Sequence, residues 1–434
     1  MNSDRKRIII GIDDTDSREG MCTTYLGALL MEELCAFGSP LGEPLLIRLN
    51  PTIPYKTRGN AAVALCFESD EPEKIIGHVV SRVSSMSRME CENTNPGVVF
   101  IREVDFKEAK PQLSEFFIRA VKDVISIDEA RALAESLGLA FRAFKNGRGL
   151  IGALAACGAM LNQDWEHTYE FLTYRKDEAC GTKRLVDNES LFGADSETYP
   201  ETWDSVDRFN ELVVCVPRSP DPVLYGIRGD TREAVEKAVA MVRSEEIERS
   251  CIYRTNQGTD MHLIRAGGVD DILEMHSYML EGTVVSPAVT IRGGHSIFIL
   301  EDDAGRTIDC AAFEPTKNFR EVVRRLVPGD RVVVYGSVTE DTLNIEKICI
   351  LSLADVSEER NPACPSCGKR MKSAGSGQGY RCRRCATSAA ETELVPLERD
   401  LGPGFYEVPP CARRHLAKPL VRFRCPEFPV FPGR

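Results

Sequence analysis

The sequence RIIIGIDDTDSREGMCTTYLG, residues 7–27, joins an apolar run to a cluster of aspartates and then to a second apolar repeat. The apolar run predicts a buried strand over residues 7–12. From Leu26 onward, leucines recur at helical spacing, and Thr23 and Thr24 lie at the expected start of this helix. The pattern indicates a strand, an acidic loop and a helix, typical of an α/β domain.

Asp13, Asp14 and Asp16 place three negative charges at the end of the predicted strand. Carboxylates held this close repel one another, and a bound divalent cation is the usual compensation. Mg²⁺ prefers oxygen ligands and usually shares them with substrate phosphates. We interpret the three aspartates as ligands for Mg²⁺ carrying a nucleoside triphosphate. The simpler alternative is a solvated turn whose side chains cap the helix.

Thr23 and Thr24 have two interpretations of their own. The N-terminus of a helix presents unpaired N–H groups and a positive dipole end, which favour a phosphate. A threonine there can cap the helix or receive a phosphoryl group, and capping is the default from the residues alone.

Two basic, glycine-containing stretches are candidates for contacts with nucleotide phosphates. They are PYKTRGN (54–60) and KNGRG (145–149), and the second precedes a helix of small residues. Neither is a Walker motif, so glycine spacing alone is weak evidence. The candidate nucleotide-binding residues are Lys56, Arg58, Gly59, Lys145, Gly147, Arg148 and Gly149.

A length of 434 residues predicts about three or four domains. Alternating helices and strands indicate an α/β unit to about residue 135. A second unit has predicted strands at 212–216 and 251–255 and a helix at 232–242, an order compatible with a ferredoxin-like module. From Ser277, three strands, a helix and two more strands fit a five-stranded OB barrel.

The late cysteines have the spacing of a metal site, Cys364-x2-Cys367 and Cys382-x2-Cys385. Two such pairs predict tetrahedral zinc in a ribbon, and four cysteine ligands leave no open position, so the zinc should be structural. The net charge is −12, but residues 361–390 carry basic side chains and no acidic ones. We interpret this region as a local electropositive module on an acidic body. A rigid ribbon would hold its basic side chains against phosphates: Lys369, Arg370, Arg381, Arg383 and Arg384.

Composition and hydropathy exclude a membrane protein. The chain is 43% hydrophobic and 28% charged, and it has no apolar stretch of the roughly 18 residues that a membrane helix needs. The N-terminus lacks the features of a secretory signal. We therefore expect a cytoplasmic protein without a membrane partner.

Two further stretches combine acidic and aromatic residues, ETWDSVD (201–207) and TNQGTDMH (255–262). Carboxylates beside an aromatic wall suit a cationic ligand, although an acidic surface loop is an equal alternative. Arg228 lies between two glycines, where the backbone can approach a ligand. His415 belongs to a tail rich in proline and aromatic residues, which we expect to pack on a neighbouring domain.

Seven motifs occur in the order of a known family. GIDDTDSREGMCTTYLG, RLNPTIPYKTRGN, GRGLIGALAA, PVLYGIRG, CAAFEPTK, CPSCGKRM and PGFYEVPPCARRHL closely resemble the archaeal isoleucine-tRNA 2-agmatinylcytidine synthetases, also called agmatidine synthetases. The resemblance spans nearly the entire chain. It implies a multidomain α+β protein with a kinase-like α/β domain at 1–135, a ferredoxin-like domain at 136–270, an OB-fold β-barrel at 277–355, a zinc ribbon at 360–395 and a C-terminal tail at 396–434.

The resemblance also implies an activity. Members of the family are ligases that use ATP to join agmatine to C2 of the wobble cytidine in the isoleucine tRNA with a CAU anticodon. The product, agmatidine, pairs with adenine, so AUA is decoded as isoleucine. The reaction proceeds through phosphoryl activation of the cytidine C2 oxygen and then amine attack.

The family's residue roles transfer to matching positions. Asp13, Asp14 and Asp16 become the Mg²⁺ and phosphate site, with Lys56, Arg58 and the GRG loop near the nucleotide, and Thr23 becomes an autophosphorylated threonine. The basic residues of the ribbon become the tRNA-binding residues. Agmatine carries a guanidinium, which needs carboxylates. The candidates for binding the agmatine guanidinium are Asp204, Asp207 and Asp260, and this assignment is a hypothesis.

Two alternatives belong to other classes. A non-catalytic RNA-binding protein would use the barrel and ribbon and would turn over no ATP. A two-metal nuclease or phosphatase built on the aspartates would cleave RNA without ATP or an amine.

Overall fold

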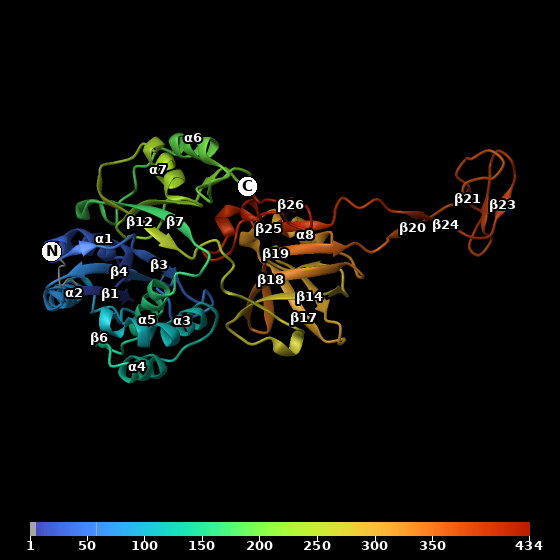
Figure 1. The fold of residues 1–434 in the computed structure, drawn as a ribbon. Coiled ribbons are helices and arrows are strands. Elements are labelled where there is room, and N and C mark those ends of the chain that lie inside the picture. Colours follow the sequence, from blue (N-terminus) through green and yellow to red (C-terminus); the bar gives the residue numbers. More distant parts are fainter. Residues whose placement is uncertain (1–5, 58) are drawn as a thin grey trace.

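The computed structural model describes residues 6–57 and 59–434. It has a large α/β body, a β-barrel beside that body and a small ribbon that stands away from both on a thin arm (Figure 1). The C-terminal segment returns from the arm to the junction between barrel and body.

One ten-stranded sheet runs through the whole α/β body, in the order β6-β5-β1-β4-β3-β12-β7-β11-β8, with β2 paired to β4. The predicted strands near residues 7–12 and 251–255 are confirmed as β1 and β12. The two α/β units share this sheet because β3 and β12 pair in parallel, with Leu45 opposite Arg254. The strands are β1 (Lys6–Asp13), β2 (Ser39–Pro40), β3 (Leu45–Arg48), β4 (Ala61–Ser69), β5 (Gly97–Arg102), β6 (Ala140–Ala143), β7 (Thr168–Arg175), β8 (Thr202–Trp203), β11 (Val223–Gly229) and β12 (Ile247–Thr255).

Helices cover both faces of the first half of the sheet, which explains the unbroken apolar run in β1. Ile8, Ile10 and Ile12 join one core cluster, which includes residues of α1 and α2. Ile9 joins a second cluster on the opposite face, with residues of α3, α4 and α5. The helices are α1 (Thr23–Glu33), α2 (Pro72–Met86), α3 (Phe106–Lys122), α4 (Ile127–Ser136) and α5 (Gly149–Leu161).

Helix α5 lies unusually close to β1, and small residues make this possible. A β-carbon on Gly11 would lie 2.1 Å from the carbonyl oxygen of Ala153, and one on Gly152 would lie 2.0 Å from the Asp13 carboxylate. Larger side chains would push the helix off the sheet. The GRGLIGALAA stretch therefore brings the start of α5 against the end of β1.

The second α/β unit has its own core on one face of β7 and β11, which includes Leu191, Leu224 and Val235. Its helices are α6 (Asn188–Thr198) and α7 (Arg232–Met241), and α7 confirms the helix predicted at 232–242. The predicted strand at 212–216 is shorter in the structure, where β10 (Leu212–Val213) pairs with β9 (Val206–Asp207).

The barrel closes because β14 pairs with both β16 and β18, and β19 pairs with β17 and β18. The β17–β19 pair is parallel and the β14–β18 pair is antiparallel. The predicted order of three strands, a helix and two strands is confirmed. The barrel consists of β14 (Ser277–Val284), β16 (Ser296–Glu301), β17 (Thr307–Ala312), α8 (Phe319–Arg324), β18 (Arg331–Thr339) and β19 (Thr342–Ser352), with β13 (Leu263–Arg265) and β15 (Val289–Thr290) at its margin.

Beyond the barrel, β20 (Ser357–Arg360) and β24 (Glu393–Pro396) pair to form the arm. The arm carries the ribbon strands β21 (Lys372–Ser373), β22 (Tyr380–Arg381) and β23 (Ser388–Ala389). The chain then adds β25 (Gly404–Glu407) to the barrel, and β26 (Val430–Phe431) pairs with β25.

The predicted domain boundary at residue 135 falls inside α4, and the sheet of the first unit continues to β6, which pairs with β5. Among residues 6–57 and 59–434, no helix combines the length and the apolar character needed to cross a membrane.

Candidate functional site

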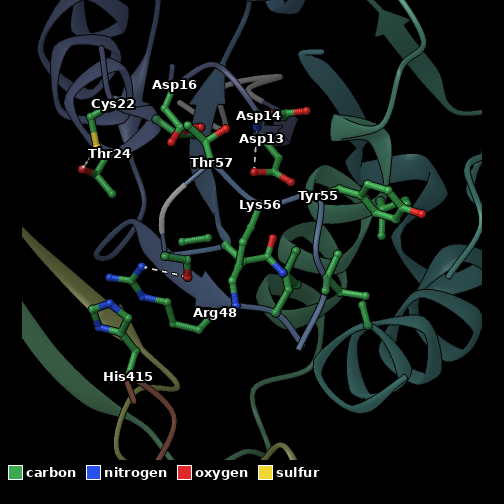
Figure 2. Close-up of a pocket in the computed structure, with 18 of the residues that line it drawn as sticks. Asp13, Asp14, Asp16, Cys22, Thr24, Arg48, Tyr55, Lys56, Thr57 and His415 are labelled. Carbon is green, nitrogen blue, oxygen red and sulfur yellow. Dashed lines mark hydrogen bonds between the residues drawn. The ribbon is translucent and has the colours of Figure 1, made fainter. Parts of the chain in front are cut away.

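A cavity of about 780 Å³ opens where β1 ends and α1 and α5 begin. Its wall contains Asp13, Asp14 and Asp16 and also residues of the second α/β unit, such as Glu170 and Arg228. His415 of the C-terminal segment completes one end. Figure 2 shows the aspartates at one side of the cavity, the Arg48 and His415 side chains at another, and Lys56 between them.

Hydrogen bonds hold the aspartate loop in one conformation. Asp14 has a φ of 57°, and its backbone N–H donates to Oδ1 of Asp13 at 2.7 Å. The N–H of Asn95 donates to Oδ2 of Asp14 at 3.2 Å, and Nε of Arg148 lies 3.3 Å from the same oxygen. The predicted glycine-rich turn thus reaches the predicted acidic loop through Arg148.

The positive charge around Asp13 and Asp14 is too small to offset their burial and their mutual repulsion. Burial, followed by repulsion from Asp14, raises the pKa of Asp13 well above its ordinary value. Burial also raises the pKa of Asp14 to about 7, although the Arg148 guanidinium opposes the shift. A bound Mg²⁺ would offset this repulsion, and carboxylate oxygens are the ligands that it prefers. Asp13, Asp14 and Asp16 are the residues that would hold it.

Thr23 is the first residue of α1, as predicted, but it does not cap the helix. Cys22 occupies the N-cap position, without a side-chain cap from the described residues. Oγ1 of Thr23 accepts from Oγ1 of Thr15 at 3.0 Å, and Thr23 lies in the cavity wall. Thr24 also lines the cavity, but its Oγ1 forms a hydrogen bond with Sγ of Cys22 at 3.1 Å. The acceptor role of Thr23 leaves its own proton available to a group in the cavity.

The opposite side of the cavity is basic, and the sequence patterns did not predict most of it. Glu170 lies on β7, 3.1 Å from Nε of Arg228 and 3.7 Å from Nη2 of Arg48. Burial raises the pKa of Glu170, but the two arginines outweigh it and the net shift is downward. Burial lowers the pKa of Arg48 to about 10, with Glu170 opposing. These side chains and Lys56 suit an anionic ligand.

The predicted nucleotide-binding residues divide into two groups. Lys56, Gly59 and Arg148 lie in the cavity wall, whereas Arg58 lies outside the described residues. Lys145 instead donates to the backbone oxygen of Cys91 at 2.5 Å. Gly147, with a φ of 77°, forms the turn, and Gly149 starts α5. Lys145, Gly147 and Gly149 therefore shape the loops around the site without lining it.

The predicted agmatine residues lie elsewhere. Asp204 pairs with the buried guanidinium of Arg413, and Asp207 accepts from Nδ2 of Asn210 at 3.0 Å. Asp260 lies 2.6 Å from Nζ of Lys347. Within the described chain, the cavity wall includes none of the three. Asp204 and Trp203 instead line a separate small pocket, and each of the three carboxylates already has a protein partner.

The four ribbon cysteines converge, as predicted. Their Sγ atoms lie within 4.8 Å of one another, and those of Cys367 and Cys382 are 3.7 Å apart. Zinc–sulfur bonds of about 2.3 Å in a tetrahedron give sulfur–sulfur distances of about 3.8 Å, so the donor set fits Zn²⁺. The predicted tRNA-binding residues are all exposed around these knuckles: Lys369, Arg370, Arg381, Arg383 and Arg384.

Three family models match the chain. They are the TiaS TCKD domain over residues 9–146, the TiaS FLD domain over 147–262 and the TiaS C-terminal zinc ribbon domain over 361–401.

Known proteins match over nearly their full length. The isoleucine-tRNA 2-agmatinylcytidine synthetase TiaS of Methanosarcina mazei is 60% identical over 428 residues, which are 98% of this chain and 100% of the relative. The Archaeoglobus fulgidus protein of the same name is 50% identical, over 96% of this chain and 97% of its own. The crystal structure of apo TiaS aligns with a TM-score of 0.90 at 47% identity, covering 98% of this chain and 99% of the other.

These similarities place the fold and site in the class of synthetases that act on a tRNA. More narrowly, the chain belongs to the TiaS family, the isoleucine-tRNA 2-agmatinylcytidine synthetases, and the predicted family is confirmed.

Proposed function

We propose that this chain is the ligase that joins agmatine to C2 of the wobble cytidine of the isoleucine tRNA with the CAU anticodon, using ATP as the energy source. The observation that carries the proposal is the match, over nearly the whole chain, to synthetases of that name. A TiaS complex with its isoleucine tRNA and ATP aligns with a TM-score of 0.88 at 47% identity, over 98% of this chain and 100% of the other. A TiaS complex with the same tRNA, AMPCPP and agmatine aligns at 0.86.

The chemistry requires a leaving group at C2. Phosphoryl transfer from ATP to the C2 oxygen converts a poor leaving group into a phosphate ester. The agmatine amine then attacks C2, a C–N bond forms, the C2–O bond breaks, and the phosphate leaves with that oxygen while the amine loses a proton. Bound Mg²⁺ supplies charge neutralisation for the transferred phosphate. The modified base pairs with adenine, so AUA is read as isoleucine.

The acidic side of the cavity supports the phosphoryl-transfer part of the proposal. Asp13, Asp14 and Asp16 would hold Mg²⁺, which would neutralise the phosphates of ATP, and Arg148 orients Asp14. Thr23 lines the cavity, its Oγ1 accepts from Thr15, and it receives a phosphoryl group in autophosphorylation. Lys56 contributes positive charge for the nucleotide.

The position of agmatine follows less directly from the contacts. Direct binding by Asp204, Asp207 and Asp260 stays a prediction, and their existing partners weigh against it. An effect of their substitution on the agmatine KM, separated from an effect on stability, decides the matter.

The domains have assigned tasks in this proposal. The first α/β unit is the kinase-like domain and the second is the ferredoxin-like domain. The closed barrel has the strand order of an OB-fold, in which the third strand pairs in parallel with the fifth. The barrel and the zinc ribbon grip the tRNA at its acceptor stem, while the wobble base is splayed out of the anticodon loop into the cavity. The protein works in the cytoplasm.

Transfer of labelled agmatine tests the function. Purified protein, Mg²⁺, ATP and a transcript of this isoleucine tRNA should incorporate labelled agmatine into RNA, and omission of ATP should abolish incorporation. RNA binding without ATP turnover would support a non-catalytic protein. RNA cleavage without ATP would support a nuclease.

A further inference from the structure

His415 enters the cavity from the far end of the chain, and its backbone is fixed there. The N–H of Gly258, after β12, donates to the carbonyl oxygen of His415 at 2.8 Å. The N–H groups of Thr259 and Asp260 donate to the carbonyl of Leu416 at 3.2 and 2.9 Å. The second α/β unit therefore holds the C-terminal segment in register, and the imidazole has a defined position beside Arg48 (Figure 2).

The contact with Arg228 determines which ring nitrogen of His415 carries the proton. Nη2 of Arg228 lies 2.8 Å from Nδ1 of His415. A guanidinium has only donors, so Nδ1 must be the acceptor and the proton of a neutral imidazole must be on Nε2. Arg228 cannot turn away freely, because its Nε is held 3.1 Å from Glu170.

The surroundings keep the ring neutral. Burial lowers the pKa of His415 well below its ordinary value, and Arg48, Arg228 and Lys56 lower it further. A second proton on the ring would also have to replace the hydrogen bond from Arg228. Nε2 faces the loop that carries Lys56, because a β-carbon at Gly59 would lie 3.3 Å from it.

We propose that His415 is a substrate-contacting residue of the ligase, whose Nε2–H donates to an anionic oxygen of a ligand bound in the cavity. The ligand class follows from Arg48, Arg228 and Lys56, three cations against the carboxylate of Glu170. This end of the cavity therefore suits a phosphate. The phosphate belongs either to ATP or to the tRNA backbone. The same geometry excludes His415 as the base that deprotonates agmatine, since Nδ1 already accepts from Arg228 and Nε2 is protonated. The identity of the ligand rests on the proposed function. The tautomer of His415 rests only on its contact with Arg228.

Two substitutions distinguish the loss of the hydrogen bond that Nε2 of His415 donates from a defect in the structure of the site. His415→Asn retains an acceptor near the Nδ1 position for Arg228 and lacks a donor at Nε2. His415→Gln places an amide nitrogen near the Nε2 position. We expect His415→Asn to lower kcat/KM for agmatine transfer about 10- to 100-fold, the effect of losing one hydrogen bond to a charged group, and His415→Gln to restore most of it.

Binding measurements identify the source of the phosphate. If His415→Asn raises the Kd for ATP in the absence of tRNA, the phosphate belongs to ATP. If it raises the Kd for the isoleucine tRNA in the absence of ATP, the phosphate belongs to the RNA. His78→Asn is the matched control, because His78 lies on α2, is not part of the cavity wall, and its Nε2 lies 2.7 Å from Oε2 of Glu33. It should leave both affinities and transfer unchanged.

Wild-type rates in folded His415→Asn, or equal losses in both His415 variants, would overturn the proposal. The ¹⁵N spectrum tests the tautomer independently of ligase activity, and the signal lost in His415→Asn identifies the residue among six histidines. A neutral Nε2–H form from pH 6 to 8 is expected, and an imidazolium or Nδ1–H form contradicts the inference. Failure of the wild type to transfer agmatine would instead remove the proposed function.

Discussion

Nε of Arg148 lies 3.3 Å from the carboxylate of Asp14, across 134 positions of sequence. The contact ties the start of α5 to the acidic loop after β1, and it is the chief interaction that opposes the upward pKa shift of Asp14. The ionisation of Asp14, and with it the Mg²⁺ binding that we propose, would therefore depend on a residue of the glycine-rich turn.

Removal of Arg148 should shift the pH dependence of the ligase. Without the guanidinium, the pKa of Asp14 rises above about 7, so the ionised form that holds Mg²⁺ requires a higher pH. For Arg148→Ala we expect the acidic limb of the kcat/KM profile, measured at limiting Mg²⁺, to move up by about one pH unit. Arg102→Ala, which removes a surface ion pair with Glu73, is the control and should leave the profile in place. An unshifted profile in Arg148→Ala contradicts the assignment of Asp14.

The same carboxylate should make the metal-free protein less stable as pH rises. Asp14 has an ordinary pKa of 3.8 and a folded pKa of about 7, so between these values the folded state holds a proton that the unfolded state has released. The protonated Asp14 contributes its full stabilisation below the ordinary pKa of 3.8. That stabilisation is lost as the pH rises to the folded pKa of about 7. The loss should be on the order of 3 kcal/mol in the free energy of unfolding, measured with urea and EDTA at pH 5 and pH 8.

Mg²⁺ should return part of this stability at pH 8, because it binds the ionised carboxylates of the folded state. Asp14→Asn should flatten both effects. An equal pH response in Asp14→Asn and the wild type would locate the responsible groups elsewhere.

Thr23 and Thr24 should behave differently despite their adjacency. Both line the cavity, but Oγ1 of Thr23 accepts from Thr15, whereas Oγ1 of Thr24 is engaged with Sγ of Cys22. We expect Thr23→Ala to abolish transfer of ³²P from γ-labelled ATP to the protein, and Thr24→Ala to retain it. Peptide mass spectrometry of the labelled wild type should find the phosphate on Thr23. Label on another residue, or undiminished label in Thr23→Ala, would refute the assignment.

Asp204→Asn distinguishes agmatine binding from support of the C-terminal segment. Arg413 is 3% exposed and contacts both Asp204 and Glu407, so removal of one charge leaves a buried guanidinium less well paired. Breaking a buried pair costs about 3–5 kcal/mol. We expect a lower free energy of unfolding with little change in the agmatine KM of the protein that remains folded. A raised KM at unchanged stability would instead support the direct agmatine role.

Charge reversal in the ribbon should affect RNA and spare phosphoryl chemistry. Arg381 and Arg383 are exposed beside the cysteines. Their ribbon stands away from the α/β body on the arm (Figure 1). Arg381→Glu with Arg383→Glu should weaken binding of the isoleucine tRNA at least about 10-fold and reduce its salt dependence, with autophosphorylation unchanged. Equal loss of both activities would indicate a folding role for these residues. Circular dichroism and zinc content control for loss of the ribbon itself.

Local patterns predicted much of this molecule. The apolar run at 7–12 specifies β1, and the run of small residues in GRGLIGALAA specifies α5. Each is recognised from the residue types within one short segment. The spacing of Cys364 to Cys385 specifies the knuckles in the same local way. These signals depend on residues a few positions apart, where periodicity and turn chemistry decide the outcome.

The pairing of distant segments was beyond these signals. The parallel contact of β3 with β12, which joins the two α/β units in one sheet, has no local sequence signature. Glu170 reads as one polar position in a strand, and only the folded chain shows that it lies between Arg48 and Arg228. His415 was expected in a packing segment; the segment does pack, but it carries the imidazole into the cavity.

The identity of the nucleoside at the wobble position tests the proposed ligase most directly. An isoleucine tRNA transcript with the CAU anticodon is incubated with the protein, Mg²⁺, ATP and agmatine, digested with a ribonuclease to oligonucleotides and analysed by tandem mass spectrometry. We expect one cytidine per tRNA, at the wobble position, to gain the mass of agmatine less water, and Asp13→Asn to prevent the gain. An unchanged cytidine with folded wild-type protein, or an unchanged yield with Asp13→Asn, would contradict this function.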